Sequence, residues 1–363
     1  MSTAGAGERP DRQGRPGRPG RSSRRVIARR LAWLLVGLLT LAGAALLALR
    51  LLPRLQLHSV GPMVSAFAPY GLFSWTLVAL LLLRLKGRRL LVPALLALAA
   101  AAVHASWLVP FYVADETPSG GRAVTIASVN LLGGAADPDA VTRATADADV
   151  VVLMEFDPKT DRALVERGWY ERFPHHIGGP AWGTAGTAVL SRFPIRQVDS
   201  RPSGVQIYVT EISPPDGPSF HLVAAHPLNP AGGAVLWRAY GDLVIEAVRH
   251  HPDGPLVVIG DFNATPDQFT IRQLVDRAGV RNAADESGAG WLRTWPDRFY
   301  GPLPPLFSLD QAFVRGPVYA DDIATFDTRG SDHRGVIARL RVAASPPTRP
   351  TPGPATASAA AGR

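Results

Sequence analysis

The feature that most limits how this chain can fold is the uncharged run Leu31 to Leu49, LAWLLVGLLTLAGAALLAL. A helix rises about 1.5 Å per residue, so a run of this length nearly crosses the roughly 30 Å hydrocarbon layer of a bilayer. Two more apolar segments follow, from about Gly61 to Leu83 and from about Leu90 to Val113. The alternatives are a signal peptide for the first segment and buried core helices for the others, but a signal peptide is disfavoured because two more apolar segments follow at short intervals. The sequence predicts three transmembrane helices within residues 31–115.

The basic residues around these segments predict how the chain crosses the membrane. Nine arginines lie between Arg9 and Arg30, and the loop after the second segment reads RLKGRR. The loop after the first segment contains only Arg50 and Arg54 as basic residues. Because cytoplasmic loops carry an excess of Lys and Arg, the N-terminus is expected in the cytoplasm. Everything after about Ala114 is then expected outside the cell membrane.

Charge is unevenly distributed along the chain. The whole sequence has a formal net charge of +8, whereas residues 122–342 hold 21 Arg and Lys against 26 Asp and Glu, a net charge of −5. Binding to a nucleic-acid backbone requires clustered cations, so this region does not have the charge of a nucleic-acid-binding surface. The absence of cysteine excludes disulfides, thiolate metal sites and cysteine nucleophiles.

Residues 116–343 are expected to form one α/β domain. Strand-like runs recur, among them AVTIASVNL, DVVVLMEF, FHLVAAHPL and LVVIGDFN. Several alternate with a period of two, and helical stretches lie between some of them. The Arg-rich residues 1–30 and the Pro/Ala-rich residues 344–363 contain little to bury, which is typical of disordered tails.

Polar residues recur where the predicted strands end. A single Asp or Asn in such a place is usually a turn former. In this chain the strand-end residues are repeatedly Asp, Glu, Asn or His, and two stacked sheets would bring them to one rim. We expect this rim to form the functional site, from Asn130, Glu155, His226, Asp261, Asn263, Asp310, Asp332 and His333.

A carboxylate-rich pocket with two histidines suits the hydrolysis of phosphate esters. Hard oxygen ligands favour Mg²⁺ or Mn²⁺, whereas zinc usually takes more imidazole or thiolate. Such a cation polarises a phosphoryl oxygen and stabilises the leaving group. A histidine held by a carboxylate activates water or stabilises charge on phosphorus.

The order of these motifs resembles the endonuclease/exonuclease/phosphatase superfamily, which includes DNase I-like nucleases, inositol-polyphosphate 5-phosphatases and neutral sphingomyelinases. GDFN at 260–263 and SDH at 331–333 carry the resemblance as a pair, with SLDQAFV at 308–314 between them. The resemblance covers residues 122–342. It implies a DNase I-like, four-layer αββα sandwich after the three transmembrane helices, and hydrolysis of phosphate esters that depends on a divalent metal.

The resemblance also implies roles for the carboxylates and amides. Glu155 would bind the metal, with Asn130 beside it and Asp332 as a further ligand. Asp261 would orient or deprotonate the attacking water, and Asn263 would hold the phosphate.

The histidines receive roles in the same way. His333 would face the scissile phosphate and be oriented by Asp310, and His226 would be the second histidine facing the phosphate. Gln311 stands where the family often has His or Tyr. Because Asp310 is kept, we expect the chemistry to survive, while the resemblance leaves the effect of Gln311 on the rim of the site open.

The layout of the whole chain resembles actinobacterial membrane proteins of the VanJ type, which are linked to teicoplanin resistance. That resemblance implies a lipid-linked phosphate substrate, for example undecaprenyl pyrophosphate. Our hypothesis is a membrane-anchored, metal-dependent phosphoesterase that acts outside the membrane, with the lipid bilayer as its partner. The alternatives are an extracytoplasmic nuclease, which the net charge of −5 disfavours, and a non-catalytic binding protein on the same fold.

Overall fold

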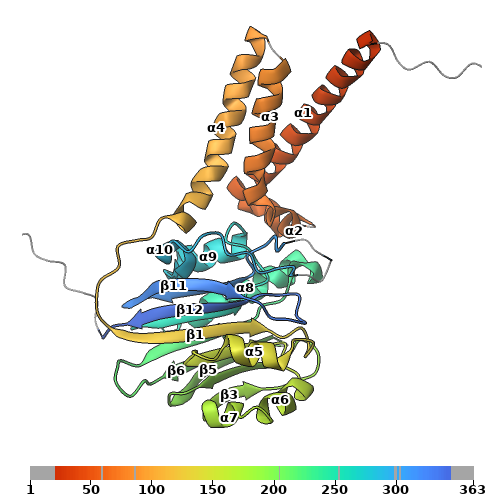
Figure 1. The fold of residues 1–363 in the computed structure, drawn as a ribbon. Coiled ribbons are helices and arrows are strands. Elements are labelled where there is room, and N and C mark those ends of the chain that lie inside the picture. The colour runs from red at the N-terminus through yellow and green to blue at the C-terminus, as the bar shows by residue number, and fades with distance from the viewer. Residues whose placement is uncertain are drawn as a thin grey trace, which may run out of the picture.

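Three long helices precede the sheets in the computed structural model, which describes residues 21–58, 60–85, 87–203, 205–251, 254–297, 301 and 304–344. They are α1 (Arg21–Leu51), α3 (Gly71–Leu85) and α4 (Leu91–Leu108). The short 3-10 helices η2 (Ala68–Tyr70), η3 (Arg88–Leu90) and η4 (Val109–Tyr112) extend α3 and α4. By length and composition, residues 24–51, 68–85 and 88–112 could each cross a membrane. Figure 1 shows α3 and α4 side by side, with α1 inclined to them.

The first helix begins earlier than predicted. α1 starts at Arg21 rather than Leu31, so residues 21–30 are helical and do not belong to a disordered tail. The reason is local: no Gly or Pro lies between Arg21 and Val36, and Arg and Ala are good helix formers. Residues 1–20 and 345–363, which the tail predictions also cover, lie outside the described residues.

The prediction of one helix for residues 61–83 is wrong, because the second apolar segment is interrupted. It divides into a short helix α2 (Gly61–Ser65), a turn with η2, and α3. Pro69 lacks a backbone N–H and cannot continue a regular helix through this point, which explains the break. Together with η1 (Pro53–Leu57), α2 lies between the long helices and the domain (Figure 1).

The domain is built from two six-stranded sheets. One sheet has the order β11-β12-β1-β2-β4-β3 and the other β5-β6-β7-β8-β10-β9. The strands are β1 (Arg122–Asn130), β2 (Val150–Met154), β3 (His175–Gly179), β4 (Thr187–Ser191), β5 (Ile195–Ser203), β6 (Val205–Ile212), β7 (Phe220–Ala225), β8 (Leu256–Asp261), β9 (Arg281–Asn282), β10 (Asp310–Arg315), β11 (Val318–Phe326) and β12 (Gly335–Val342).

Helices cover the outer face of each sheet. They are α5 (Pro138–Ala144), α6 (Pro158–Val165), α7 (Trp169–Arg172), α8 (Ala234–Arg249) and α9 (Phe269–Ala278), with the 3-10 helix η5 (Pro230–Gly232) before α8. The short helix α10 (Ala283–Ser287) instead contributes Ala283 and Ala284 to the core between the sheets. Residues of α5, α6 and α7 share a core with β1 and β2, whereas residues of α8 and α9 share one with β7 and β8. A third core lies between the sheets. The predicted four-layer αββα sandwich is confirmed.

Strand β2 shows why the sequence folds into these layers. All its residues are buried, and successive side chains point to opposite faces of the sheet. Val150, Val152 and Met154 enter the core between the sheets, whereas Val151 and Leu153 pack under the helices. A strand covered on both faces is therefore apolar throughout.

The pairing of the strands brings the predicted site residues to one edge. β1 and β2 are parallel, as are β7 and β8, and Asn130 at the end of β1 donates to Asp261 at the end of β8, so the four carboxyl ends lie at the same side of the sandwich. β10 runs antiparallel to β8, and this register places Asp310, where β10 begins, opposite Asp261, where β8 ends.

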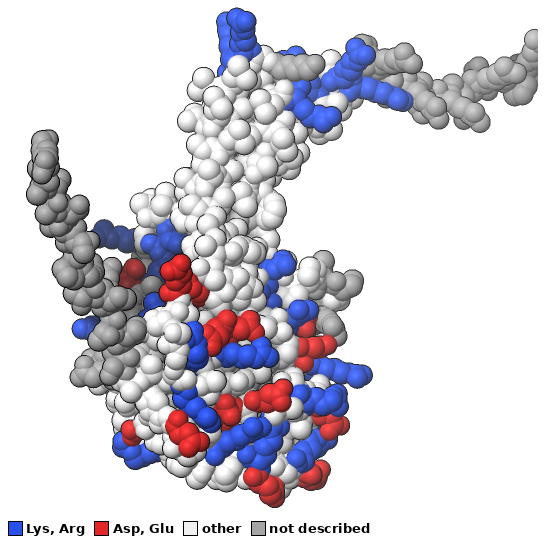
Figure 2. Space-filling view, turned by 60° about the vertical axis from the view of Figure 1, so that its left-hand side comes forward, with Lys and Arg blue, Asp and Glu red and all other residues white. Residues whose placement is uncertain are grey.

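The helical segment is fixed to this edge by hydrogen bonds and one ion pair. The contacts join residues 50–62 to the start of α9: Arg50 Nε to Asp267 Oδ1 at 2.9 Å, Gln268 Nε2 to the Pro62 carbonyl at 2.6 Å, and the Phe269 backbone N–H to Gln56 Oε1 at 2.7 Å. The domain therefore lies at the end of the helices where α1 finishes and α3 begins. Figure 2 shows basic residues at the opposite end and a band without charged residues between the two.

Candidate active site

The end of strand β8 depends on a glycine. Gly260 has a φ of +155°, and a Cβ at this position would lie 1.9 Å from the carbonyl oxygen of Ala225 on the neighbouring strand. Only glycine lets β7 and β8 approach this closely, because the atom it would meet belongs to the backbone. The next residue, Asp261, is thereby placed at the end of a buried strand with its side chain buried as well.

Two other site residues have left-handed backbones. Glu155 has a φ of +50° and Asn263 a φ of +48°, values that residues other than glycine rarely adopt. Such strain concentrates at functional sites, where the surrounding structure maintains it. At Asn263 the support is visible: its backbone N–H donates to Asp261 Oδ1 at 2.8 Å and its Nδ2 to the Pro227 carbonyl at 3.0 Å.

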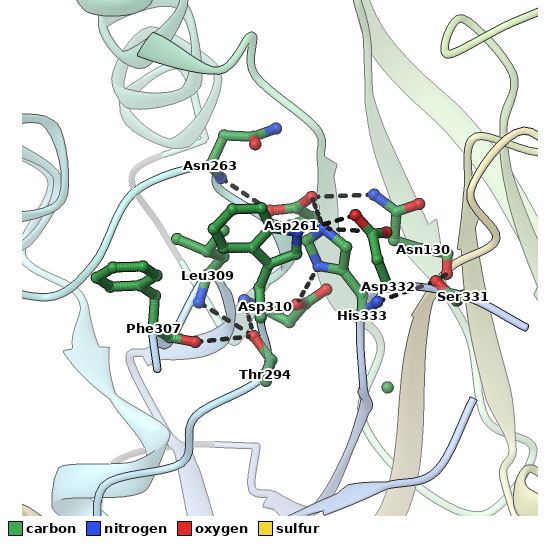
Figure 3. A network of polar contacts seen from close by, with 12 residues as sticks. Asn130, Asp261, Asn263, Thr294, Phe307, Leu309, Asp310, Ser331, Asp332 and His333 are labelled. Atoms are coloured by element: carbon green, nitrogen blue, oxygen red, sulfur yellow. Dashed lines mark hydrogen bonds and ion pairs between the residues drawn. The ribbon is translucent and has the colours of Figure 1, made fainter. Parts of the chain in front are cut away.

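His333 and Asp310 form a buried pair. The two side chains meet at 2.8 Å between His333 Nδ1 and Asp310 Oδ2 (Figure 3). The backbone N–H groups of Leu309 and Asp310 both donate to Thr294 Oγ1 at 3.1 Å, which fixes the start of β10. The other ring nitrogen, His333 Nε2, lies 3.6 Å from Asp261 Oδ2 and so faces the remaining carboxylates.

The electrostatics of this pair favour a protonated histidine. Burial alone lowers the pKa of His333, but the carboxylates of Asp310, Asp261 and Asp332 outweigh it and raise the pKa to about 10. Burial raises the pKa of Asp310, opposed by the attraction of His333. We take the pair as imidazolium and carboxylate at neutral pH, because three acidic groups surround one histidine.

Asn130 connects the two sheets at the site. Its Nδ2 donates to Glu155 Oε1 at 3.2 Å and to Asp261 Oδ2 at 3.0 Å. His226 Nε2 lies 3.8 Å from each of the same two carboxylate oxygens. An amide donor and a histidine thus hold two acidic side chains near one another.

The carboxylates fit a divalent cation. Asp332 Oδ2 accepts from Trp295 Nε1 at 2.9 Å, but its Oδ1 is buried without a hydrogen-bond partner. An unpartnered buried carboxylate oxygen is costly unless a cation binds it. Oxygen donors from Glu155, Asp261 and Asp332 line one pocket, which is the ligand chemistry of Mg²⁺ or Mn²⁺.

A second group of possible ligands was not predicted as a metal site. Among the described residues, donor atoms of Asp261, Asp310 and His333 lie within 4.8 Å of one another. This group could also hold a divalent cation, because metal binding would displace the proton from the imidazole.

The structure brings all the predicted residues to one pocket of about 630 Å³. Asn130 and Asp310 lie behind its surface and hold the others, while the lining includes Glu155, His226, Asp261, Asn263, Asp332 and His333. Gln311 is buried and is not among the residues that line the pocket. Its Nε2 donates to the Ala264 carbonyl at 2.7 Å.

Sequence reasoning missed some residues that shape the site. Thr294 and Ser331 are buried supports: Ser331 Oγ donates to the Asn130 carbonyl at 2.8 Å and accepts from the His333 N–H at 3.1 Å. Thr294 is the first residue of the stretch TWP at 294–296 and Ser331 the first residue of SDH, and these positions were the available signal. The pocket is also lined by Met63, Ala66 and Phe67 from the helical segment, which the sequence assigned to a membrane span.

Several solved structures resemble this chain at low sequence identity. TDP2 from D. rerio, complexed with single strand DNA product, is 17% identical over 61% of this chain and 99% of its own, with a TM-score of 0.49. An endonuclease/exonuclease/phosphatase family protein from Bacteroides thetaiotaomicron is 15% identical over 61% and 98%, with a TM-score of 0.47. A member from Beutenbergia cavernae is 21% identical over 61% and 72%, with a TM-score of 0.47.

No curated protein matches the chain. The model of the endonuclease/exonuclease/phosphatase family matches residues 127–333, which is more than half of the chain and includes the whole site. The motifs GDFN and SDH, the two-sheet sandwich and the shared rim agree with this match. The chain belongs to the endonuclease/exonuclease/phosphatase family.

Proposed function

We propose that this protein is a membrane-anchored phosphoesterase that hydrolyses a lipid-linked phosphate ester or pyrophosphate with the help of Mg²⁺ or Mn²⁺. The observation that carries the proposal is the network of Asp261, Asp310 and His333 at one end of a pocket that Glu155 and Asp332 also line. Membership of the family supports the same reaction class.

Each side chain has a role that its contacts support. A bound divalent cation would polarise a phosphoryl oxygen and stabilise charge on the leaving group. Glu155 and Asp332 would hold this cation. Asn130 fixes the Asp261 carboxylate by its hydrogen bond of 3.0 Å, so that Asp261 can orient the attacking water and accept its proton.

The histidines and Asn263 act on the phosphate. His333 Nε2 is directed into the pocket while Asp310 holds Nδ1, so an imidazolium here donates to a phosphoryl oxygen. The oxygen of water forms a bond to phosphorus as the bond to the leaving oxygen breaks. The water proton passes through Asp261, and the leaving oxygen ends protonated or as an anion near the histidines.

The arrangement of the helices supports a lipid-linked substrate outside the cell membrane. The pocket lies where α1 ends and the second candidate span begins, and the basic residues of the loop between α3 and α4 are at the other end. With the basic end in the cytoplasm, the pocket is extracytoplasmic and close to the bilayer. An anchor raises the effective concentration of a membrane-bound substrate.

The test uses the full chain in detergent, with Mg²⁺ or Mn²⁺. Undecaprenyl pyrophosphate, a sphingomyelin-type lipid and plasmid DNA are offered in parallel, and phosphate release and DNA cleavage are measured. We expect hydrolysis of a lipid that stops with EDTA and returns with added metal. Asp261→Asn should abolish it, whereas Asp276→Asn, an exposed carboxylate on α9, should not.

Two results would contradict the proposal. Cleavage of DNA alone would replace the lipid phosphoesterase with a nuclease. Hydrolysis unaffected by EDTA would remove the role of the cation.

A further inference from the structure

The catalytic pocket has apolar as well as charged walls, and part of the apolar wall comes from outside the sandwich. Met63, Ala66 and Phe67 line the pocket from α2 and the turn that follows. Leu228, Phe307 and Leu309 line the same pocket from the domain. The carboxylates and His333 line it too, so one cavity joins charged and apolar surfaces.

Aromatic contacts connect the α2 side to the carboxylates. The ring of Phe67 meets that of Phe307 edge-on at 4.8 Å between centroids. Phe307 in turn stacks on Trp295 at 5.9 Å, and Trp295 Nε1 donates to Asp332 Oδ2 at 2.9 Å. The apolar wall therefore adjoins the metal-binding end without an intervening polar layer.

The wall is held firmly against the domain. Gln268 Nε2 donates to the Pro62 carbonyl at 2.6 Å on one side of α2. On the other side, Tyr70 Oη donates to the Leu306 carbonyl at 2.9 Å. These contacts bracket residues 63–67, so the wall belongs to the folded site.

The side chains of the wall are nevertheless uncovered. Met63 is 42% exposed and Phe67 is 43% exposed, although both lie beside a buried catalytic network. Covering apolar surface of this kind is favourable by roughly 25 cal/mol per Å². The candidate span that begins at Ala68 follows directly, so the occupant that covers this wall comes from the bilayer side.

We propose that α2 is the specificity wall of the active site, and that Met63 and Phe67 bind the first apolar units of the substrate tail. The inference rests on the proposed phosphoesterase function and assigns its substrate class: an amphiphile whose apolar chain is attached directly to the phosphate or pyrophosphate. A cavity of about 630 Å³ has the size of a small-molecule site. It holds the phosphate and the start of a tail, and the rest of a long tail extends toward the bilayer.

The experiment compares two pyrophosphates that differ only in tail length. Full-length protein in detergent is given dimethylallyl or farnesyl pyrophosphate, and kcat/KM is measured for each from phosphate release. In the wild type we expect farnesyl pyrophosphate to be preferred. Met63→Ser should lower the ratio of kcat/KM for farnesyl pyrophosphate to kcat/KM for the shorter pyrophosphate by about tenfold, because a polar side chain replaces an apolar one that the tail covers.

Matched variants separate binding from folding. Val64→Ser is the control, because Val64 lies on the same helix and is 37% exposed but does not line the pocket. It should leave the ratio unchanged. Met63→Leu should retain the wild-type ratio, and the Tm of each variant shows whether the fold is preserved.

The outcomes distinguish this inference from the function on which it rests. If both pyrophosphates are hydrolysed and Met63→Ser gives the same ratio as Val64→Ser, the wall is not a substrate contact and only this inference fails. If the wild type hydrolyses no phosphate ester at all, the proposed function fails and takes the inference with it.

Discussion

His333 shows how neighbouring groups set the chemistry of a single residue. Its imidazole is buried, yet three carboxylates favour the charged form and raise the pKa to about 10. A raised histidine pKa means that the imidazolium is present below that pH and is lost as pH rises through it. A reaction that uses His333 as a donor should therefore persist at neutral pH and decline in the alkaline range.

Asp310→Asn tests this dependence. The substitution keeps an acceptor for His333 Nδ1 but removes a negative charge, so the pKa of His333 should fall. We expect the alkaline decline of kcat to move to lower pH, and kcat at neutral pH to drop by about 10²-fold, the lower end for losing acid–base assistance. The measurement is kcat against pH for the variant and wild type, with Asp276→Asn as control. If the alkaline decline of kcat occurs at the same pH in the variant and the wild type, His333 is not the donor whose loss of a proton limits the reaction.

Gly260→Ala tests the backbone that positions Asp261. The new Cβ would meet the Ala225 carbonyl at 1.9 Å, and a backbone atom cannot turn aside. We expect a loss of at least about 2 kcal/mol in the free energy of unfolding, the range typical of strain at a special backbone position. Thermal unfolding should show it as a lower Tm. Gly179→Ala, where a Cβ meets nothing within 4 Å, should unfold near the wild-type temperature.

At this scale the sequence predicted which residues lie together and, through the resemblance, that Asp310 orients His333, but it did not predict the other contacts among them. Asn130, Glu155 and Asp261 could be recognised because each ends an apolar strand. That Asp261 faces Asp310 depends on the pairing of β8 with β10, which are separated by a long stretch of chain. The left-handed backbones of Glu155 and Asn263 are tertiary features without a sequence signal.

Among the elements, α2 shows that hydropathy alone does not identify which apolar residues belong to a membrane span. Its apolar residues extend the run that continues into α3, so composition alone assigned both to one span. The structure places α2 against the domain, because Pro69 interrupts the helix and Gln268 bonds to the Pro62 carbonyl. An apolar side chain looks the same in sequence whether it contacts lipid, protein or substrate. The strands, by contrast, were predictable from β-branched runs and alternation.

The ion pair between α1 and the start of α9 gives a prediction at the same scale. Burial raises the pKa of Asp267, and Arg50 opposes this by pairing with it at 2.9 Å. Arg50→Ala would leave the carboxylate buried and unpaired, which typically costs about 3–5 kcal/mol. We expect a large drop in Tm from Arg50→Ala and partial recovery in the double variant with Asp267→Asn. Arg54→Ala, an exposed arginine nearby, is the control; equal effects of the two arginines would contradict the prediction.

For the whole molecule, the layers of the sandwich could be predicted from the sequence pattern. The binding of the helical segment to the domain could not. The family match covers residues 127–333 and gives no sign that residues 50–70 bind to the domain or that Met63, Ala66 and Phe67 line the pocket. Those contacts join segments more than two hundred residues apart. Only a folded chain shows them.

Removing the helices should therefore destabilise the domain and alter its pocket, and not merely separate it from the helical segment. Residues 116–363 alone would expose Phe307 and leave Asp267 without Arg50. We expect this fragment to have a lower Tm than the full chain and to lose the preference for a long substrate tail. Thermal unfolding and the ratio of kcat/KM for the two pyrophosphates measure both effects. A fragment that matches the full chain in both would show that the domain is self-sufficient.

The docking of α2 also limits how interchangeable the parts of this protein are. A chimaera that joins the sandwich to the helical segment of another protein would keep every carboxylate of the site. Its pocket would lack the part of the wall that Met63 and Phe67 form. With the proposed role of α2, exchange of the helical segment at the boundary of the family match would change which substrate is bound and leave the carboxylates in place. Among relatives with helices before β1, the residues that correspond to α2 are the place to look for a change of substrate.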